Sequence, residues 1–120
     1  MRIIPILLVL ALSLTAATAY GRDPRDAAKI DALIHAVETL EGAKFIRNGQ
    51  EYDGRKAADH LRLKLRSAGD RVRTAEDFIR LCGTQSSLSG EKYRIRLTDG
   101  TTLTAEDFFR KRLRAIAADK

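Results

Sequence analysis

Cysteine is almost absent from this chain: Cys82 is the only one among 120 residues. No disulfide can therefore form within the chain, and the apolar core alone must hold the fold together. Cys82 itself leaves two alternatives open. It is either a small buried apolar residue or a thiol that forms a disulfide between two copies of the chain.

Tryptophan is missing, and the aromatic residues are three Tyr and four Phe. Such a composition offers few rings for stacking on bases, and we expect no nucleic-acid partner. Histidine occurs only twice, as His35 and His60, and neither lies at the spacing of a metal site. A Gly-x-Ser-x-Gly turn is also absent. The sequence therefore predicts no metal site and no cofactor, and it assigns no catalytic residue.

Long apolar runs are confined to the N-terminus. Arg2 precedes an apolar stretch at residues 3–14, and the small residues Ala17-Thr18-Ala19 follow. This is the layout of a secretory signal peptide, and the stretch is shorter than the roughly 20 residues of a membrane-spanning helix. We expect residues 1–19 to be removed by cleavage after Ala19. Residues 20–120 then form one small domain with no stable membrane anchor.

Positive charge is concentrated in one segment. The chain has 22 Lys and Arg against 16 Asp and Glu. Residues 55–73 hold seven basic and two acidic side chains, whereas the regions before and after this segment are nearly balanced. A basic surface of this kind attracts an anionic envelope component or an acidic protein partner, although it is also typical of a solvated surface without a partner.

Two Xaa-Gly turns predict two β-hairpins. Asn48-Gly49 and Asp99-Gly100 each lie between short runs that suit strands. A helix precedes the first hairpin: Asp23 is a suitable N-cap, and apolar residues recur at helical spacing from Pro24 to Glu41. The architecture strand, turn, short strand, cap and helix therefore occurs twice.

The segment after Asp53 has two readings. Alternation of apolar and basic residues at 61–66 suits a strand, but the alanines before it and the cap favour a helix that ends at Gly69. In that helix the face opposite the core would carry His60, Leu63, Lys64 and Ser67.

The pentapeptide Thr-Ala-Glu-Asp-Phe occurs at residues 74–78 and again at 104–108. Thr-x-x-Asp is a variant of the capping box, in which the side chains satisfy free amides at the start of a helix. The acids would alternatively be metal ligands or an acid–base pair. Neighbouring residues on a helix point about 100° apart, so the two carboxylates do not converge on one ion. We expect two helix starts.

Five segments follow one another along the chain: Phe45-Ile46-Arg47-Asn48-Gly49, residues 60–65, residues 74–79, Ser86-Ser87-Leu88-Ser89-Gly90 and Tyr93. In their order and spacing these segments resemble the YfeK-like family of small exported bacterial proteins, whose function is unknown. The resemblance covers about residues 30–113 and implies export to the periplasm and one compact domain. It implies no activity, substrate, cofactor or catalytic residue.

The resemblance also implies that some relatives have cysteines where this chain has Ala43 and Leu97. Those positions would then be adjacent, and the strand through Phe45 would lie near the strand through Ile95. This chain lacks both cysteines.

Together these patterns predict an α+β fold, with about four helices packed on a small antiparallel sheet built from two hairpins. Apolar helix faces would supply most of the core. The expected core residues are Ile30, Leu33, Ile34, Val37, Leu61, Leu65, Phe78, Phe109 and Leu113.

Three functions remain open. The first is a non-enzymatic module that binds an anionic ligand or partner through the basic segment and the hydroxyl-rich loop at residues 84–90. The second is a small hydrolase or transferase in which His60 activates a serine of the Ser86–Ser89 loop, oriented by Asp59 or Asp70. The third is a structural dimer with an apolar patch around Leu63. The candidate binding residues are Arg47, His60, Arg62, Lys64, Ser86, Ser87 and Ser89.

Overall fold

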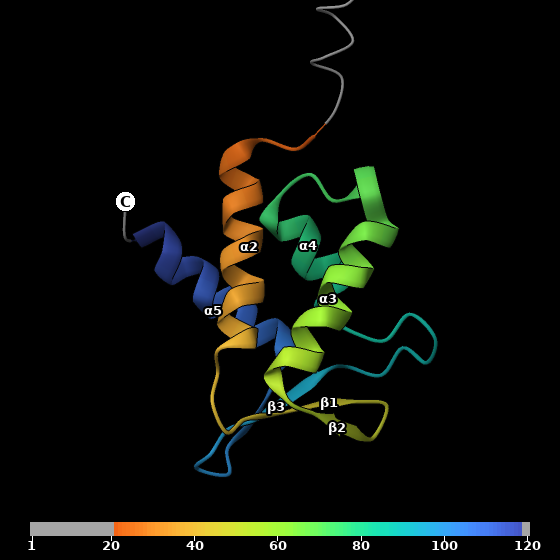
Figure 1. Ribbon diagram of the computed structural model, residues 1–120, viewed down its shortest axis with the longest axis vertical. Coiled ribbons are helices and arrows are strands. Elements are labelled where there is room, and N and C mark those ends of the chain that lie inside the picture. Colours follow the sequence, from red (N-terminus) through yellow and green to blue (C-terminus); the bar gives the residue numbers. More distant parts are fainter. Residues whose placement is uncertain (1–20, 119–120) are drawn as a thin grey trace, which may run out of the picture.

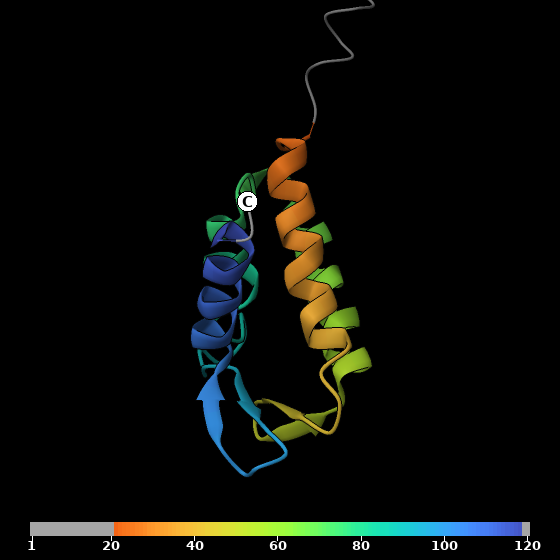
Figure 2. The ribbon, with the colours of Figure 1, turned by 90° about the vertical axis from the view of Figure 1, so that its left-hand side faces the viewer.

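The computed structural model describes residues 21–118, so the expected signal peptide and its cleavage point lie outside the described residues. The fold is α+β, as predicted (Figure 1). Four helices stand side by side, and the sheet covers one end of them (Figure 2). The helices are α2 (Pro24–Glu38), α3 (Gly54–Ala68), α4 (Ala75–Cys82) and α5 (Ala105–Ala118), and a 3-10 turn, η1 (Gly69–Arg71), follows α3. The strands are β1 (Lys44–Arg47), β2 (Gln50–Tyr52), β3 (Arg94–Arg96) and β4 (Thr102–Thr104).

Both predicted hairpins are confirmed, and they join edge to edge. The strand order is β2-β1-β3-β4, with every neighbouring pair antiparallel. Phe45 pairs with Ile95 across the two central strands, which agrees with the proximity implied by the family resemblance. In the first turn Asn48 has φ +52° and Gly49 has φ +78°, the left-handed conformations that a two-residue hairpin turn requires.

The first helix ends at Glu38 rather than at Glu41, which corrects the expected boundary. Thr39 closes the helix, because both its amide and its hydroxyl donate to the carbonyl of His35. Gly42 therefore lies in the following turn, with φ +74°, and not directly after the helix. A Cβ at this position would collide with the side chain of Thr98.

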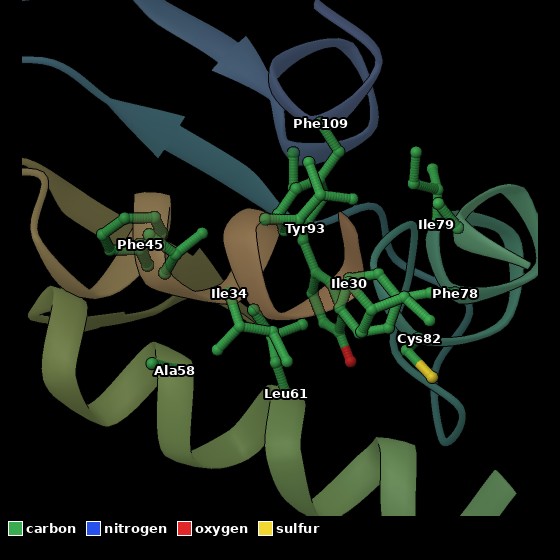
Figure 3. Close-up of a cluster of buried hydrophobic side chains, with 14 of the residues drawn as sticks. Ile30, Ile34, Phe45, Ala58, Leu61, Phe78, Ile79, Cys82, Tyr93 and Phe109 are labelled. Carbon is green, nitrogen blue, oxygen red and sulfur yellow. The ribbon is translucent and has the colours of Figure 1, made fainter. Parts of the chain in front are cut away.

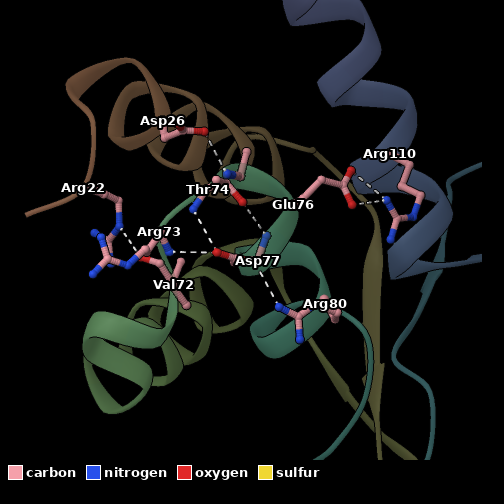
Figure 4. A network of polar contacts seen from close by, with 10 residues as sticks. Arg22, Asp26, Val72, Arg73, Thr74, Glu76, Asp77, Arg80 and Arg110 are labelled. Carbon is pink, nitrogen blue, oxygen red and sulfur yellow. Dashed lines mark hydrogen bonds and ion pairs between the residues drawn. The ribbon is translucent and has the colours of Figure 1, made fainter.

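The other helix starts follow the predicted caps. The segment after Asp53 is a helix, since the Asp53 carboxylate accepts from the amide of Lys56 at 2.9 Å. Thr74 and Asp77 form a complete capping box at the start of α4 (Figure 4). At the second pentapeptide Thr104 accepts from the amide of Asp107 at 3.1 Å. Both pentapeptides are therefore helix starts, as predicted.

Acidic residues near the starts of α2 and α4 also form contacts between helices. The two carboxylate oxygens of Glu76 in α4 accept from Arg110 in α5 at 2.7 and 2.8 Å (Figure 4). Asp26 in α2 accepts from the amide of Ala75 at 3.1 Å, at the start of α4. The Asp26 contact satisfies a free amide at the start of α4, and both contacts join neighbouring helices around the core.

The core lies between the four helices and the inner face of the sheet (Figure 3). Phe78 and Phe109 meet edge to face with ring centroids 5.8 Å apart, and Cys82 is buried beside them as a free cysteine. Leu65 and Leu113 are only partly buried, in contrast to the expectation, and pack against the outside of this core. The expected core residues that are buried are Ile30, Leu33, Ile34, Val37, Leu61, Phe78 and Phe109.

Candidate functional site

A cavity of about 330 Å³ lies between α3 and the sheet, and we call it the α3–sheet pocket. Its inner surface is apolar: Leu61 comes from α3, Ile95 from β3 and Phe109 from α5. Its volume is within the range of small-molecule sites, roughly 300–1,000 Å³. Basic side chains also line it, among them Arg47 at the end of β1 and Lys56 near the start of α3.

Tyr93 connects the pocket to α3. It directly precedes β3, its side chain is buried, and its hydroxyl points toward α3 (Figure 3). Lys64 Nζ donates to this hydroxyl at 3.0 Å and lies 5.0 Å from the centroid of the ring. His60 Nε2 is 3.3 Å from the same hydroxyl, and the two rings meet edge to face. The phenol thus holds two α3 side chains in place.

His60 and Lys64 lie one turn apart on α3 and therefore share a face. This face packs against Tyr93 at the margin of the core, so it does not point away from the core as expected. Leu63 is 52% exposed and does face solvent.

Arg47 is held by a second tyrosine. Its guanidinium carbon lies 5.3 Å from the centroid of the Tyr52 ring, and Nη2 donates to the Tyr52 hydroxyl at 3.4 Å. Cation–π contact of this kind keeps the cation at the mouth of the pocket while its other N–H groups remain available.

Burial lowers the pKa of His60, and the nearby charges of Arg47 and Lys64 lower it further. His60 is therefore mostly neutral at neutral pH. Because Lys64 donates to the Tyr93 hydroxyl oxygen, the hydroxyl hydrogen can point to Nε2 of His60. The positive charge at the pocket comes from the lysine and the arginines, not from the imidazole.

Arg62 lies outside this group. It donates to the two carboxylate oxygens of Glu38 in α2 at 2.9 and 3.4 Å, and it is 3.5 Å from Asp59 on its own helix. The hydrogen bond from Arg62 lowers the pKa of Glu38. Arg62 therefore joins α3 to α2, and Asp59, which also lines the pocket, has Arg62 as its partner.

The serine loop is fixed to the first hairpin. Ser86 is buried, and its hydroxyl oxygen accepts from Asn48 Nδ2 at 3.2 Å and from the amides of Leu88 and Ser89. The Ser89 hydroxyl donates to Asn48 Oδ1. Ser87 is exposed and lies in a neighbouring hollow with Lys64. Within residues 21–118, no hydrogen bond joins His60 to a serine.

The structure thus brings three candidate residues together, namely Arg47, His60 and Lys64. Arg62, Ser86 and Ser89 have structural partners elsewhere, and Ser87 is exposed. Lys64 Nζ does reach the serine loop by donating to the carbonyl of Gln85 at 3.0 Å. Sequence reasoning missed the tyrosines as site residues. The available signal was the alternation of Tyr93 with Ile95, which places both on the inner face of the sheet.

Residues 21–118 contain neither a cluster of metal ligands nor a membrane-spanning helix. No three His, Cys, Asp or Glu side chains in this part of the chain are grouped so that they could hold a metal ion. None of the described helices has both the length and the apolar character to cross a membrane.

The family of unknown function DUF5329 matches residues 24–117, from the first residue of α2 almost to the end of α5. The chain belongs to this family. It is similar to "Uncharacterized protein YfeK" of Salmonella typhimurium, with 35% identity over 85 residues that cover 71% of each chain. No solved structure matches. The resemblance to YfeK-like proteins is thereby confirmed, and the α3–sheet pocket lies within the DUF5329 domain.

Proposed function

We propose that this DUF5329 protein is an exported, non-enzymatic binding module that takes an anionic ligand at the α3–sheet pocket. The observation that carries the proposal is the position of two cations from different elements beside one pocket: Arg47 lines it, and Lys64 donates to the hydroxyl of Tyr93, which also lines it. Each is half-buried and is held against a tyrosine ring. The periplasm is the proposed location, because the N-terminal sequence has the layout of a signal peptide.

Both cations lack an acidic neighbour. Within the described part of the chain, no carboxylate lies within 4.0 Å of Arg47 or Lys64. Partial burial without a counter-ion is unfavourable for a cation, and an anionic ligand would supply that counter-ion. Arg62, in contrast, already has Glu38 as its partner at 2.9 Å.

The alternative of a serine hydrolase or transferase has less support. The imidazole of His60 contacts the Tyr93 hydroxyl, and the Ser86 hydroxyl oxygen accepts from Asn48 and from loop amides. A base and a nucleophile must lie within hydrogen-bond reach of each other. Since no such bond is present among the described residues, we favour binding over catalysis.

The test is a titration followed by NMR, in which backbone amide shifts are recorded as an anion is added. The panel comprises inorganic phosphate, octyl phosphate and purified anionic envelope polymers, each at low salt and at about 0.15 M salt. At least one member should shift the resonances of residues around the pocket, with weaker binding at the higher salt concentration. A panel with no binding member would refute the proposed function.

Two double variants separate this site from general electrostatic attraction. R47Q/K64Q removes the two cations that are held against tyrosine rings and should weaken binding at least about tenfold, because hydrogen bonds to charged groups are the stronger ones. K111Q/R112Q removes the same charge from an exposed part of α5 and should leave the affinity nearly unchanged. Equal weakening by both variants would mean that the protein attracts anions without a site.

A further inference from the structure

We infer that the ligand is a single-chain amphiphile, with a short apolar tail inside the α3–sheet pocket and an oxyanion head between Arg47 and Lys64. This inference rests on the anion-binding function proposed above and adds the chemical class of the ligand. It commits to a soluble molecule such as an alkyl carboxylate or alkyl phosphate.

The interior of the pocket suits an apolar tail. Leu61, Ile95 and Phe109 border it but are already packed in the core, with 5% or less of their surface exposed. The open apolar surface comes from Ile46 and Ala57, which are partly buried, and from Leu63, which is 52% exposed. A tail that covers these side chains removes their apolar surface from water. A compact anion such as inorganic phosphate would leave this apolar surface uncovered and gain only the contacts at the mouth.

Two cations beside the pocket suit an oxyanion head: Arg47, which lines it, and Lys64, which contacts the lining residue Tyr93. Lys64 has three N–H donors, and two of them have partners in the Tyr93 hydroxyl and the Gln85 carbonyl. One donor therefore remains. Arg47 has one long hydrogen bond, to Tyr52, and most of its guanidinium fork is available for a carboxylate or a phosphate.

The size of the pocket limits the tail to one chain. At about 330 Å³ it lies at the lower end of the range for small-molecule sites, roughly 300–1,000 Å³. Two acyl chains of a membrane lipid need more space than this. The small volume therefore favours a single-chain ligand over a membrane lipid. The apolar lining favours a ligand with a tail over a free inorganic ion.

The test compares four probes on the purified protein by titration calorimetry: octanoate, acetate, octanol and octylammonium. The affinity for octanoate should be at least about tenfold higher than the affinity for acetate, which lacks the tail, because burial of apolar surface adds affinity. It should also exceed the affinity for octanol, which lacks the charge, by about tenfold. Octylammonium should bind more weakly than octanol, because its charge has the same sign as the mouth of the pocket.

A variant that fills the pocket tests the tail separately. Ala57 lines the pocket from α3 without contributing charge, and A57L should lower the octanoate affinity to that of acetate. A115L, at an exposed position on α5, is the matched control and should bind octanoate normally. Thermal unfolding of both variants establishes that they fold, and the four-probe comparison on the unaltered protein does not depend on them.

The outcomes separate the two proposals. Equal affinity for octanoate and acetate, unchanged in A57L, would overturn the amphiphile inference and leave anion binding intact. Failure of every anion to bind would refute the proposed function as well. Co-sedimentation with phosphatidylglycerol vesicles that octanoate does not reverse would place the ligand in a membrane and would also overturn the inference.

Discussion

Gly83 offers a sensitive test of the packing between α4 and α5. It ends α4 with φ −106° and ψ 1°, a conformation that alanine adopts without strain. A Cβ at this position, however, would lie 2.8 Å from Cε2 and 2.9 Å from Cδ2 of Phe109. Favourable contacts between carbon atoms are roughly 3.5–4.0 Å long. Gly83→Ala therefore inserts a methyl group into space that the ring occupies.

The ring of Phe109 has little room to retreat. It is 1% exposed and is enclosed by the rings of Phe78 and Phe108, whose centroids are 5.8 and 5.7 Å away. Insertion of a methyl group into a packed core costs about 1–3 kcal/mol. Replacement of glycine by alanine restricts the unfolded chain and returns about 0.4–1 kcal/mol. The expected net loss in the free energy of unfolding is about 1–2 kcal/mol.

A double-mutant cycle with Phe109→Leu isolates this contact. Leucine lacks the ring edge that meets the new methyl group, so in the Phe109→Leu background Gly83→Ala should cost less than about 0.5 kcal/mol. Urea unfolding, followed by circular dichroism, gives the four free energies if the denaturant slope stays constant. An additive result, with coupling below about 0.5 kcal/mol, would refute the close approach of Gly83 to Phe109.

Four further predictions concern the site, the core and the N-terminus. R47Q should raise the pKa of His60, because the charge of Arg47 opposes protonation of the imidazole. NMR of the imidazole protons measures this pKa, and an unchanged midpoint would contradict the proximity of Arg47 to His60. Because the folded-state pKa of His60 is lowered from 6.5, its protonation should reduce stability as the pH falls below that value, and urea midpoints should show no such loss above it. Burial raises the pKa of the Cys82 thiol, so Ellman's reagent should react slowly with the native protein and rapidly in urea; fast native reaction would contradict its burial. Protein isolated from the periplasm should begin at Tyr20, and an intact N-terminus would contradict the signal peptide.

Local sequence signals predicted most of the fold. Asn48-Gly49 allows left-handed backbone at two successive positions, and Thr74 with Asp77 satisfies free amides at a helix start. Such interactions involve neighbours in the chain and can be read from it. The end of α2 was predicted less well, because Thr39 closes that helix with its own side chain.

The candidate site was predicted only in part, because its contacts join segments far apart in the sequence. Lys64 and His60 depend on Tyr93, which is about 30 residues further along the chain. Ser86 is likewise fixed by Asn48 from the first hairpin. Composition and spacing supply the residue types, but only the tertiary fold determines which of them share a partner.

The most direct test of the account is the position of a bound tail. In a complex with octanoate, intermolecular nuclear Overhauser effects from the terminal methyl group should reach Leu61, Ile95 and Phe109. Contacts of that methyl group with the exposed side chain of Leu88 instead, which does not line the pocket, would place the tail outside it and contradict the account.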